Sequence, residues 1–128
     1  MRGPIPNSYR LLDGRLIGGD YPGGRDDMPA RGKLGALFDA GVTTFIDLTE
    51  PHELAPYDVL VAELARARGG EVKYCRLPIR DASVPRSAAV MREILDEIDD
   101  ALDNGGVVYV HCWGGVGRTG TVVGCHLV

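Results

Sequence analysis

Residues 107–120 read Val-Val-Tyr-Val-His-Cys-Trp-Gly-Gly-Val-Gly-Arg-Thr-Gly, and an apolar stretch follows them from Val122. The β-branched and aromatic start predicts a buried strand, and the apolar stretch beyond the glycines predicts a helix. A glycine-rich turn between a strand and a helix directs backbone N–H groups toward an anion. Because this turn also carries a thiol and a guanidinium, it predicts an enzyme that attacks a phosphate ester with sulfur.

Strands and helices are expected to alternate along the rest of the chain. The expected elements are a hairpin with strands at 9–12 and 15–17, helices at 33–40, 57–68 and 85–103, strands at 42–48 and 72–77, and a final helix from Gly117. Residues 1–8 are expected to be a poorly ordered lead-in, and the glycine- and proline-rich residues 18–31 a loop. This alternation predicts an α/β fold with a central, mostly parallel sheet flanked by helices. In such sheets ligands bind beyond the carboxyl ends of the strands.

Length and charge limit the classes of function. The 128 residues are enough for one domain with a sizeable core, and the formal net charge of −4 argues against nucleic acid as the main partner. We find no apolar run long enough for a membrane span and no signal peptide. The three cysteines are an odd number, which favours a reducing compartment over a disulfide framework. We therefore expect a cytoplasmic protein.

The end of the chain is unusual for a finished domain. Residues 121–128 are apolar nearly all round, which is typical of a central, buried helix, and they lack a capping glycine or a polar tail. We therefore expect residues 1–128 to form a single domain that is C-terminally truncated and lacks the helices that would cover this one.

A phosphate monoester resists nucleophiles because its own negative charge repels them. A site must therefore neutralise the phosphate oxygens and leave an in-line path for attack. Glycines keep side chains away from the phosphate, and the planar fork of Arg118 suits two of its oxygens better than a lysine would. The expected phosphate-binding residues are Trp113, Gly114, Gly115, Val116, Gly117 and Arg118.

Cys112 is the expected nucleophile of this turn. A helix N-terminus lowers cysteine pKa values from roughly 8.5 to about 3.5–7.5, which favours the reactive thiolate. The Thr119 hydroxyl is placed to donate a hydrogen bond to the sulfur, and His111 to orient the loop from behind. A lone buried cysteine is usually only a small apolar residue. Its combination with three glycines, Arg118 and Thr119 at these offsets favours catalysis.

These residues resemble the signature loop of the protein tyrosine phosphatase superfamily, His-Cys-x-x-Gly-x-x-Arg-Ser/Thr-Gly. The matching positions are His111, Cys112, Gly115, Arg118, Thr119 and Gly120. The loop and the small size are similar to the dual-specificity branch, and within it to kinase-associated phosphatase and its bacterial relatives. Residues 15–23 and 45–49 also look like these proteins. The resemblance implies a dual-specificity-phosphatase-like fold, with further helices after the signature helix that this chain lacks.

Asp81 is the candidate proton donor. A phenolate or alkoxide leaving group needs a proton as its bond to phosphorus breaks, and a positioned carboxylic acid supplies it. Leu77-Pro78-Ile79-Arg80-Asp81, followed by Pro85, is similar to the general-acid loop of the dual-specificity branch. The alternative is a turn or helix-capping aspartate, because a helix is expected to begin at Pro85.

Other candidates are weaker. We see no cluster at metal-ligand spacing, so we expect no metal and no cofactor. Cys75 is either a strand cysteine or a partner that protects Cys112 in a disulfide. Asp47 and Glu50 follow or end a strand, where they either contact the signature loop or lie in solvent.

The favoured function is a cysteine-dependent phosphatase acting on phosphotyrosine of a phosphoprotein or phosphopeptide, with phosphoserine and phosphothreonine as further candidates. One alternative is a phosphoinositide or inositol phosphate phosphatase. Such relatives often carry lysines in the signature loop, where this chain has Trp113 and Val116. Another is a non-catalytic phospho-binding module, if the truncation inactivates the site.

Overall fold

The computed structural model describes residues 3–5, 8–11, 15–22, 27–49, 57–70, 72–77, 88–112, 119 and 122. Five strands form one sheet in the order β1-β2-β5-β3-β4, and all neighbours are parallel except the antiparallel edge pair β1 and β2. The elements are β1 (Ser8–Leu11), β2 (Leu16–Gly19), α1 (Asp27–Asp39), β3 (Thr44–Asp47), α2 (Asp58–Ala67), β4 (Lys73–Arg76), α3 (Ala88–Asp103) and β5 (Val108–His111). The predicted α/β fold with a mostly parallel sheet is therefore confirmed.

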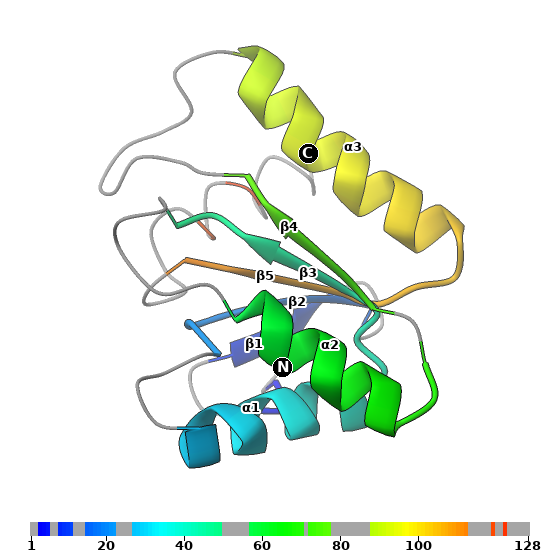
Figure 1. Ribbon diagram of the computed structural model, residues 1–128. Coiled ribbons are helices and arrows are strands. Elements are labelled where there is room, and N and C mark those ends of the chain that lie inside the picture. Colours follow the sequence, from blue (N-terminus) through cyan, green and yellow to red (C-terminus); the bar gives the residue numbers. More distant parts are fainter. Residues whose placement is uncertain are drawn as a thin grey trace.

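Helices cover the two faces of the sheet, with α1 and α2 on one face and α3 on the other (Figure 1). Side chains alternate between these faces along β5. Val108 and Val110 pack in the cluster that contains Ile94 and Ile98 of α3, whereas Tyr109 packs in the cluster beneath α1 and α2. This alternation continues past the strand end and decides which side each site residue faces.

The amphipathic helix predicted at 85–103 is confirmed as α3, which is described from Ala88. Ile94 and Ile98, four residues apart, are fully buried because they lie on one face of the helix. The helix is closed by Gly105, whose φ of 78° is left-handed, and by the bond from the Gly106 N–H to the Ala101 carbonyl.

Two predictions near the N-terminus are wrong. The expected loop over residues 18–31 contains the start of α1, which begins at Asp27. Pro29 is tolerated in the first turn because a residue there has no helical partner for an N–H, so the N–H that proline lacks is not needed. The expected lead-in over residues 1–8 is also ordered in part. Ile5 is 4% exposed, and the Ser8 hydroxyl at the start of β1 donates to the Ile5 carbonyl at 2.6 Å.

The carboxyl ends of the four parallel strands line up at one edge of the sheet. Gly19 of β2 pairs with His111 of β5, His111 with Asp47 of β3, and Asp47 with Arg76 of β4. Cys112 follows directly after this row. The chemistry-bearing turn therefore begins where the sequence places it, at the carboxyl edge.

Candidate active site

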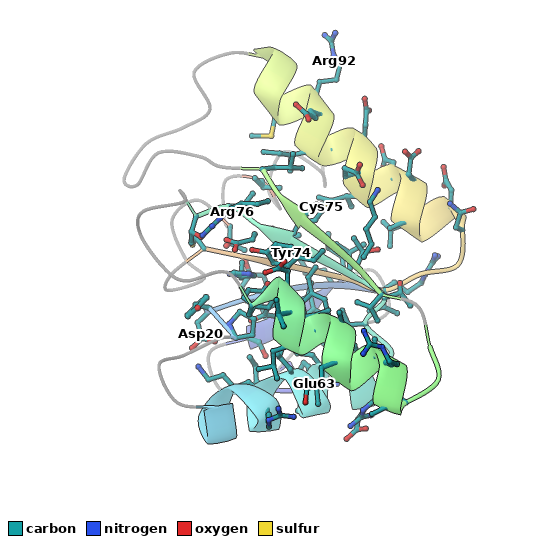
Figure 2. All side chains as sticks on the ribbon, in the orientation of Figure 1. Asp20, Glu63, Tyr74, Cys75, Arg76 and Arg92 are labelled. Atoms are coloured by element: carbon teal, nitrogen blue, oxygen red, sulfur yellow. The ribbon has the colours of Figure 1, made fainter. Side chains whose placement is uncertain are left out.

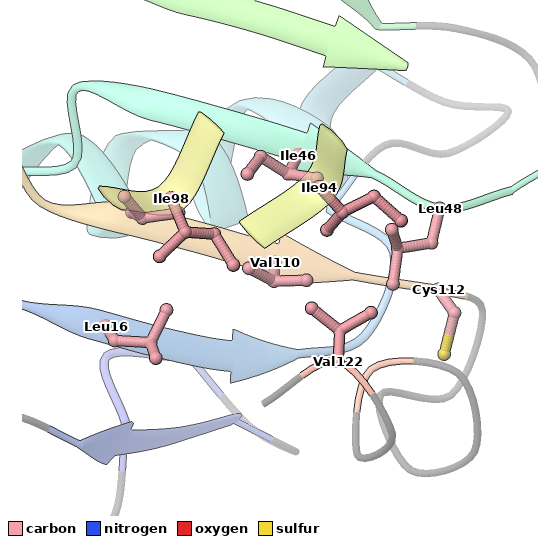
Figure 3. Packing of buried hydrophobic residues seen from close by; sticks show 9 residues of the cluster. Leu16, Ile46, Leu48, Ile94, Ile98, Val110, Cys112 and Val122 are labelled. Atoms are coloured by element: carbon pink, nitrogen blue, oxygen red, sulfur yellow. The ribbon is translucent and has the colours of Figure 1, made fainter. Parts of the chain in front are cut away.

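Cys112 lies immediately beyond β5 with only 3% of its surface exposed. It belongs to the cluster on the α3 side of the sheet, beside Leu48 and Val122 (Figure 3). Thr119 and Val122 are helical, and the Thr119 hydroxyl donates a hydrogen bond to the Cys112 sulfur at 3.2 Å. The buried Cys112 sulfur is thus held against a hydroxyl donor, and a hydrogen bond of this kind is one that a thiolate accepts more strongly than a thiol does.

His111 faces the opposite side, beneath α2, and is fully buried. Its Nδ1 lies 3.1 Å from the Cys112 carbonyl oxygen, which only accepts, so Nδ1 carries the proton. The neutral Nε2 then accepts a hydrogen bond from the Tyr57 hydroxyl. Burial lowers the pKa of His111, against the opposing charge of Asp47, and keeps the ring neutral. Both ring nitrogens therefore have a hydrogen-bond partner, and the imidazole binds the carbonyl of Cys112, the first residue of the turn.

The Asp47 carboxylate is buried behind His111, with no exposed surface. Oδ1 accepts from the Thr49 N–H at 2.9 Å and from the Thr49 hydroxyl at 2.5 Å, and Oδ2 accepts from the Tyr74 hydroxyl at 2.6 Å. Arg76 of β4, which is labelled with Tyr74 and Cys75 of the same strand in Figure 2, supplies the counter-charge, and its Nε lies 3.6 Å from Oδ2. Oδ1 lies 3.9 Å from Nε2 of His111. A buried charge is costly unless it is paired and hydrogen-bonded, and here it is both.

Known phosphatases match this chain in both sequence and fold. The sequence profile of the DSP-PTPase phosphatases of polymorphic toxin systems matches residues 19–128. The chain belongs to this family.

Individual relatives agree with the family. The tyrosine phosphatase homologue 067L of Invertebrate iridescent virus 3 is 30% identical over 125 residues, which are 94% of this chain but 45% of the viral protein. This chain therefore spans less than half the length of that curated relative. The active form of Tk-PTP has a similar fold, with a TM-score of 0.70 and 29% identity over 95% of this chain and 72% of that one. A kinase associated phosphatase with serine at its catalytic site cysteine has a TM-score of 0.70 and 25% identity, over 88% and 64%.

The structure of this DSP-PTPase domain brings together three of the predicted site residues, His111, Cys112 and Thr119. The other predicted residues lie outside the described part of the chain: Asp81, Trp113, Gly114, Gly115, Val116, Gly117 and Arg118. For these residues the sequence assignment remains a prediction.

Cys75 does not form a disulfide with Cys112 in this structure. Cys75 pairs with Ile46 of β3, which in turn pairs with Val110 of β5. Because β3 lies between them, β4 and β5 are two strand spacings of about 4.8 Å apart. This separation exceeds the roughly 7 Å between Cα atoms that a disulfide permits. Half-buried Cys75 instead lies 3.9 Å from the Glu97 carboxylate, and burial raises the pKa of its thiol.

Asp20 is a second acidic residue of this edge, directly after β2. Its carbonyl accepts a hydrogen bond from the Tyr109 hydroxyl at 2.5 Å, and Lys33 Nζ lies 3.7 Å from Oδ2. Oδ1 is buried, and it has no hydrogen-bond partner in the structure as described.

The described ranges hold no sign of a metal site or a membrane span. Within them, no three His, Cys, Asp or Glu side chains lie close enough to bind a metal, and no helix has the length and apolarity to cross a membrane. A cavity of about 510 Å³ opens at the amino edge of β3 and β4, lined in part by Thr43, Lys73, Glu97, Asp100 and Asn104. Among the candidate site residues that the structure describes, His111, Cys112 and Thr119 are not part of this lining.

Sequence reasoning missed the residues behind the turn. Tyr57 was assigned only to the start of a helix, and Tyr74 and Arg76 only to a strand or its end. One signal was available, because Asp47 interrupts the apolar run 45–48 of a strand expected to be buried. A charge at such a position needs partners, although its partners cannot be named from the sequence.

Proposed function

We propose that this chain is a cysteine-dependent protein phosphatase that hydrolyses phosphotyrosine through a phosphocysteine intermediate. The observation that supports it most strongly is the 3.2 Å contact between the Thr119 hydroxyl and the buried Cys112 sulfur at the carboxyl edge of a parallel sheet. Membership of the DSP-PTPase family supports the same reaction class. Because the sulfur must stay reduced, we place the protein in the cytoplasm.

The reaction proceeds in two steps. The Cys112 thiolate attacks phosphorus, the bond from phosphorus to the tyrosine oxygen breaks, and Asp81 gives its proton to that oxygen. Water then attacks the phosphocysteine, the Asp81 carboxylate takes a proton from it, and inorganic phosphate leaves. The sulfur returns as a thiolate, which accepts the hydrogen bond from Thr119. Arg118 and the backbone N–H groups of 113–118 neutralise the phosphate oxygens in both steps.

His111 supports this reaction without touching the substrate. Its Nδ1–H holds the Cys112 carbonyl, so the first peptide of the turn has one orientation. Because the carbonyl is turned back into the protein, the N–H groups that follow are free to face the anion.

The substrate class follows from what the turn lacks. Residues 113–117 contain no lysine that would hold a second phosphate, and Trp113 offers a flat apolar surface for an aromatic phosphoester. We therefore rank phosphotyrosine above phosphoserine and phosphothreonine, and protein substrates above phosphoinositides.

Turnover of a panel of phosphopeptides and phosphoinositides tests the proposal. Cys112→Ser should abolish turnover and retain tungstate binding, read from the fluorescence of Trp113, the single tryptophan. Turnover that survives in Cys112→Ser refutes the thiolate mechanism. Faster turnover of phosphoinositides than of any phosphopeptide refutes the substrate class alone.

A further inference from the structure

Three neighbouring strands end on one row of paired residues, which are Arg76 of β4, Asp47 of β3 and His111 of β5. Residues paired in a parallel ladder point to the same face, so the three side chains lie side by side on the face of the sheet that α1 and α2 cover. Asp47 is the middle member, 3.6 Å from Arg76 and 3.9 Å from His111.

Backbone bonds connect the same row to the segments that leave it. The Asp47 carbonyl accepts from the Leu77 N–H at 2.9 Å, and the Leu48 N–H donates to the His111 carbonyl at 2.9 Å. Leu77 starts the segment that carries Asp81, and His111 starts the segment that carries Cys112. Asp47 therefore bonds to the start of the Asp81 segment through its backbone, and it lies next to the start of the Cys112 segment through its side chain and through the backbone of Leu48.

Arg76 reinforces this connection through a third residue. Its Nε donates to the Thr49 carbonyl at 3.1 Å and its Nη2 to the Thr49 hydroxyl at 2.9 Å, while that hydroxyl donates to Asp47. Only 16% of the Arg76 side chain is exposed, so these contacts restrict it to one geometry. The two acceptors are reached by two different nitrogens of the planar guanidinium, whereas a lysine carries all of its donors on a single nitrogen.

An ion pair of this kind is a poor device for stability alone. A well-packed apolar pair of similar volume often stabilises a buried site as well or better. The position of this pair, where two proposed catalytic segments leave the sheet, offers a functional reason for its presence.

We propose that Asp47 and Arg76 are positioning residues for proton transfer, holding the start of the Asp81 segment in register with the start of the Cys112 segment. This rests on the proposed function, in which Asp81 protonates the leaving group. Loss of the pair should then impair the acid step more than the binding of phosphate.

The test compares kcat/KM for phenyl phosphate, whose leaving group needs a proton, with p-nitrophenyl phosphate, whose leaving group does not. Asp47→Asn keeps the shape of the side chain and removes its charge. We expect it to lower kcat/KM for phenyl phosphate by about 10- to 100-fold more than for p-nitrophenyl phosphate. The Kd for tungstate, read from Trp113, should stay within about twofold, since phosphate contacts are unaffected.

Matched variants separate positioning from stability. Asp39→Asn removes the partner of Arg68 in an exposed ion pair. It should leave unchanged the ratio of kcat/KM for phenyl phosphate to kcat/KM for p-nitrophenyl phosphate. Arg76→Lys keeps the positive charge, and it should also lower kcat/KM for phenyl phosphate relative to kcat/KM for p-nitrophenyl phosphate. If Asp47→Asn does not fold, Arg76→Lys takes its place in the test. The double variant should lose less than the product of the two single losses, because both act through one contact.

Two results would overturn the positioning role: an equal loss for both substrates, or no loss. Asp81→Asn is run beside them and identifies which proposal has failed. If Asp81→Asn lowers the ratio and Asp47→Asn does not, only the positioning role is wrong. If Asp81→Asn keeps the wild-type ratio, the acid assigned in the proposed function is wrong.

Discussion

Tyr57 and His111 lie 54 residues apart in the chain, and the Tyr57 hydroxyl donates a hydrogen bond to Nε2 of His111 in the interior. Tyr57 directly precedes α2 and His111 ends β5, so the contact joins a covering helix to the central strand. Through the other ring nitrogen, His111 holds the carbonyl of Cys112. A phenol beneath the sheet is thus two hydrogen bonds from the first peptide of the signature loop.

Tyr57→Phe should destabilise the fold, because it leaves a buried ring nitrogen without a donor. We expect the free energy of unfolding in urea to fall by about 1–3 kcal/mol. Val59→Ala is the control, since Val59 of α2 is 75% exposed and should change stability by less than about 0.5 kcal/mol. Equal stability of Tyr57→Phe and wild type would show that this bond contributes nothing.

Thr119→Val should make Cys112 less reactive at acidic pH. The change removes the hydroxyl donor at almost constant volume, and a hydrogen bond to a charged group contributes about 1.5–3 kcal/mol. We therefore expect alkylation of Cys112 by iodoacetamide at pH 6 to slow by about tenfold or more, measured on the Cys112 peptide by mass spectrometry. Thr119→Ser, which keeps the hydroxyl, should retain most of the rate. Equal rates in Thr119→Val and wild type would contradict a role for the donor.

Stability should fall as the pH drops below about 6.5, the pKa of an unfolded histidine. Burial lowers the pKa of folded His111, with Asp47 and Asp20 opposing and Arg76 assisting, so the folded state stays neutral where the unfolded state binds a proton. The unfolded state then holds more protons, and the free energy of unfolding decreases with falling pH by up to about 1.4 kcal/mol per pH unit. Urea titrations between pH 7.5 and 5.5 measure this slope. His111→Asn should reduce it, and an unchanged slope in that variant would rule out His111 as its source.

Gly106→Ala and Gly32→Ala should have opposite effects on stability. A Cβ on Gly106 would lie 2.5 Å from the Thr43 hydroxyl and 2.8 Å from the Ala101 carbonyl oxygen, so we expect a loss of about 1–3 kcal/mol. A Cβ on Gly32 of α1 meets nothing within 4 Å, and alanine there should add up to about 1 kcal/mol through helix propensity. Thermal unfolding of both variants checks the pair. A destabilised Gly32→Ala would contradict the open helix surface.

The sequence was sufficient for features that depend on neighbouring residues. The run 107–110 is apolar enough to predict the central strand, and the spacing of Ile94 and Ile98 predicts the buried face of α3. Once a strand is known, the carboxyl edge follows, and with it the position of Cys112 and the orientation that places His111 on the other face. The spacing of apolar residues along a helix and the alternation of side chains along a strand involve only neighbouring residues, so they can be recognised without a structure.

The sequence did not identify the partners of Asp47. Tyr74 lies 27 residues from Asp47, and the Tyr57–His111 bond spans twice that distance. These contacts depend on the register between β3, β4 and β5 and on where α2 crosses the sheet. A short stretch of sequence specifies neither of them. The start of α1 was missed for a related reason, because glycine and proline oppose a helix locally while burial of Leu34 and Leu37 against the sheet compensates. Local patterns therefore predict the nucleophile's position, whereas long-range packing determines the carboxylate, phenol and guanidinium that surround it.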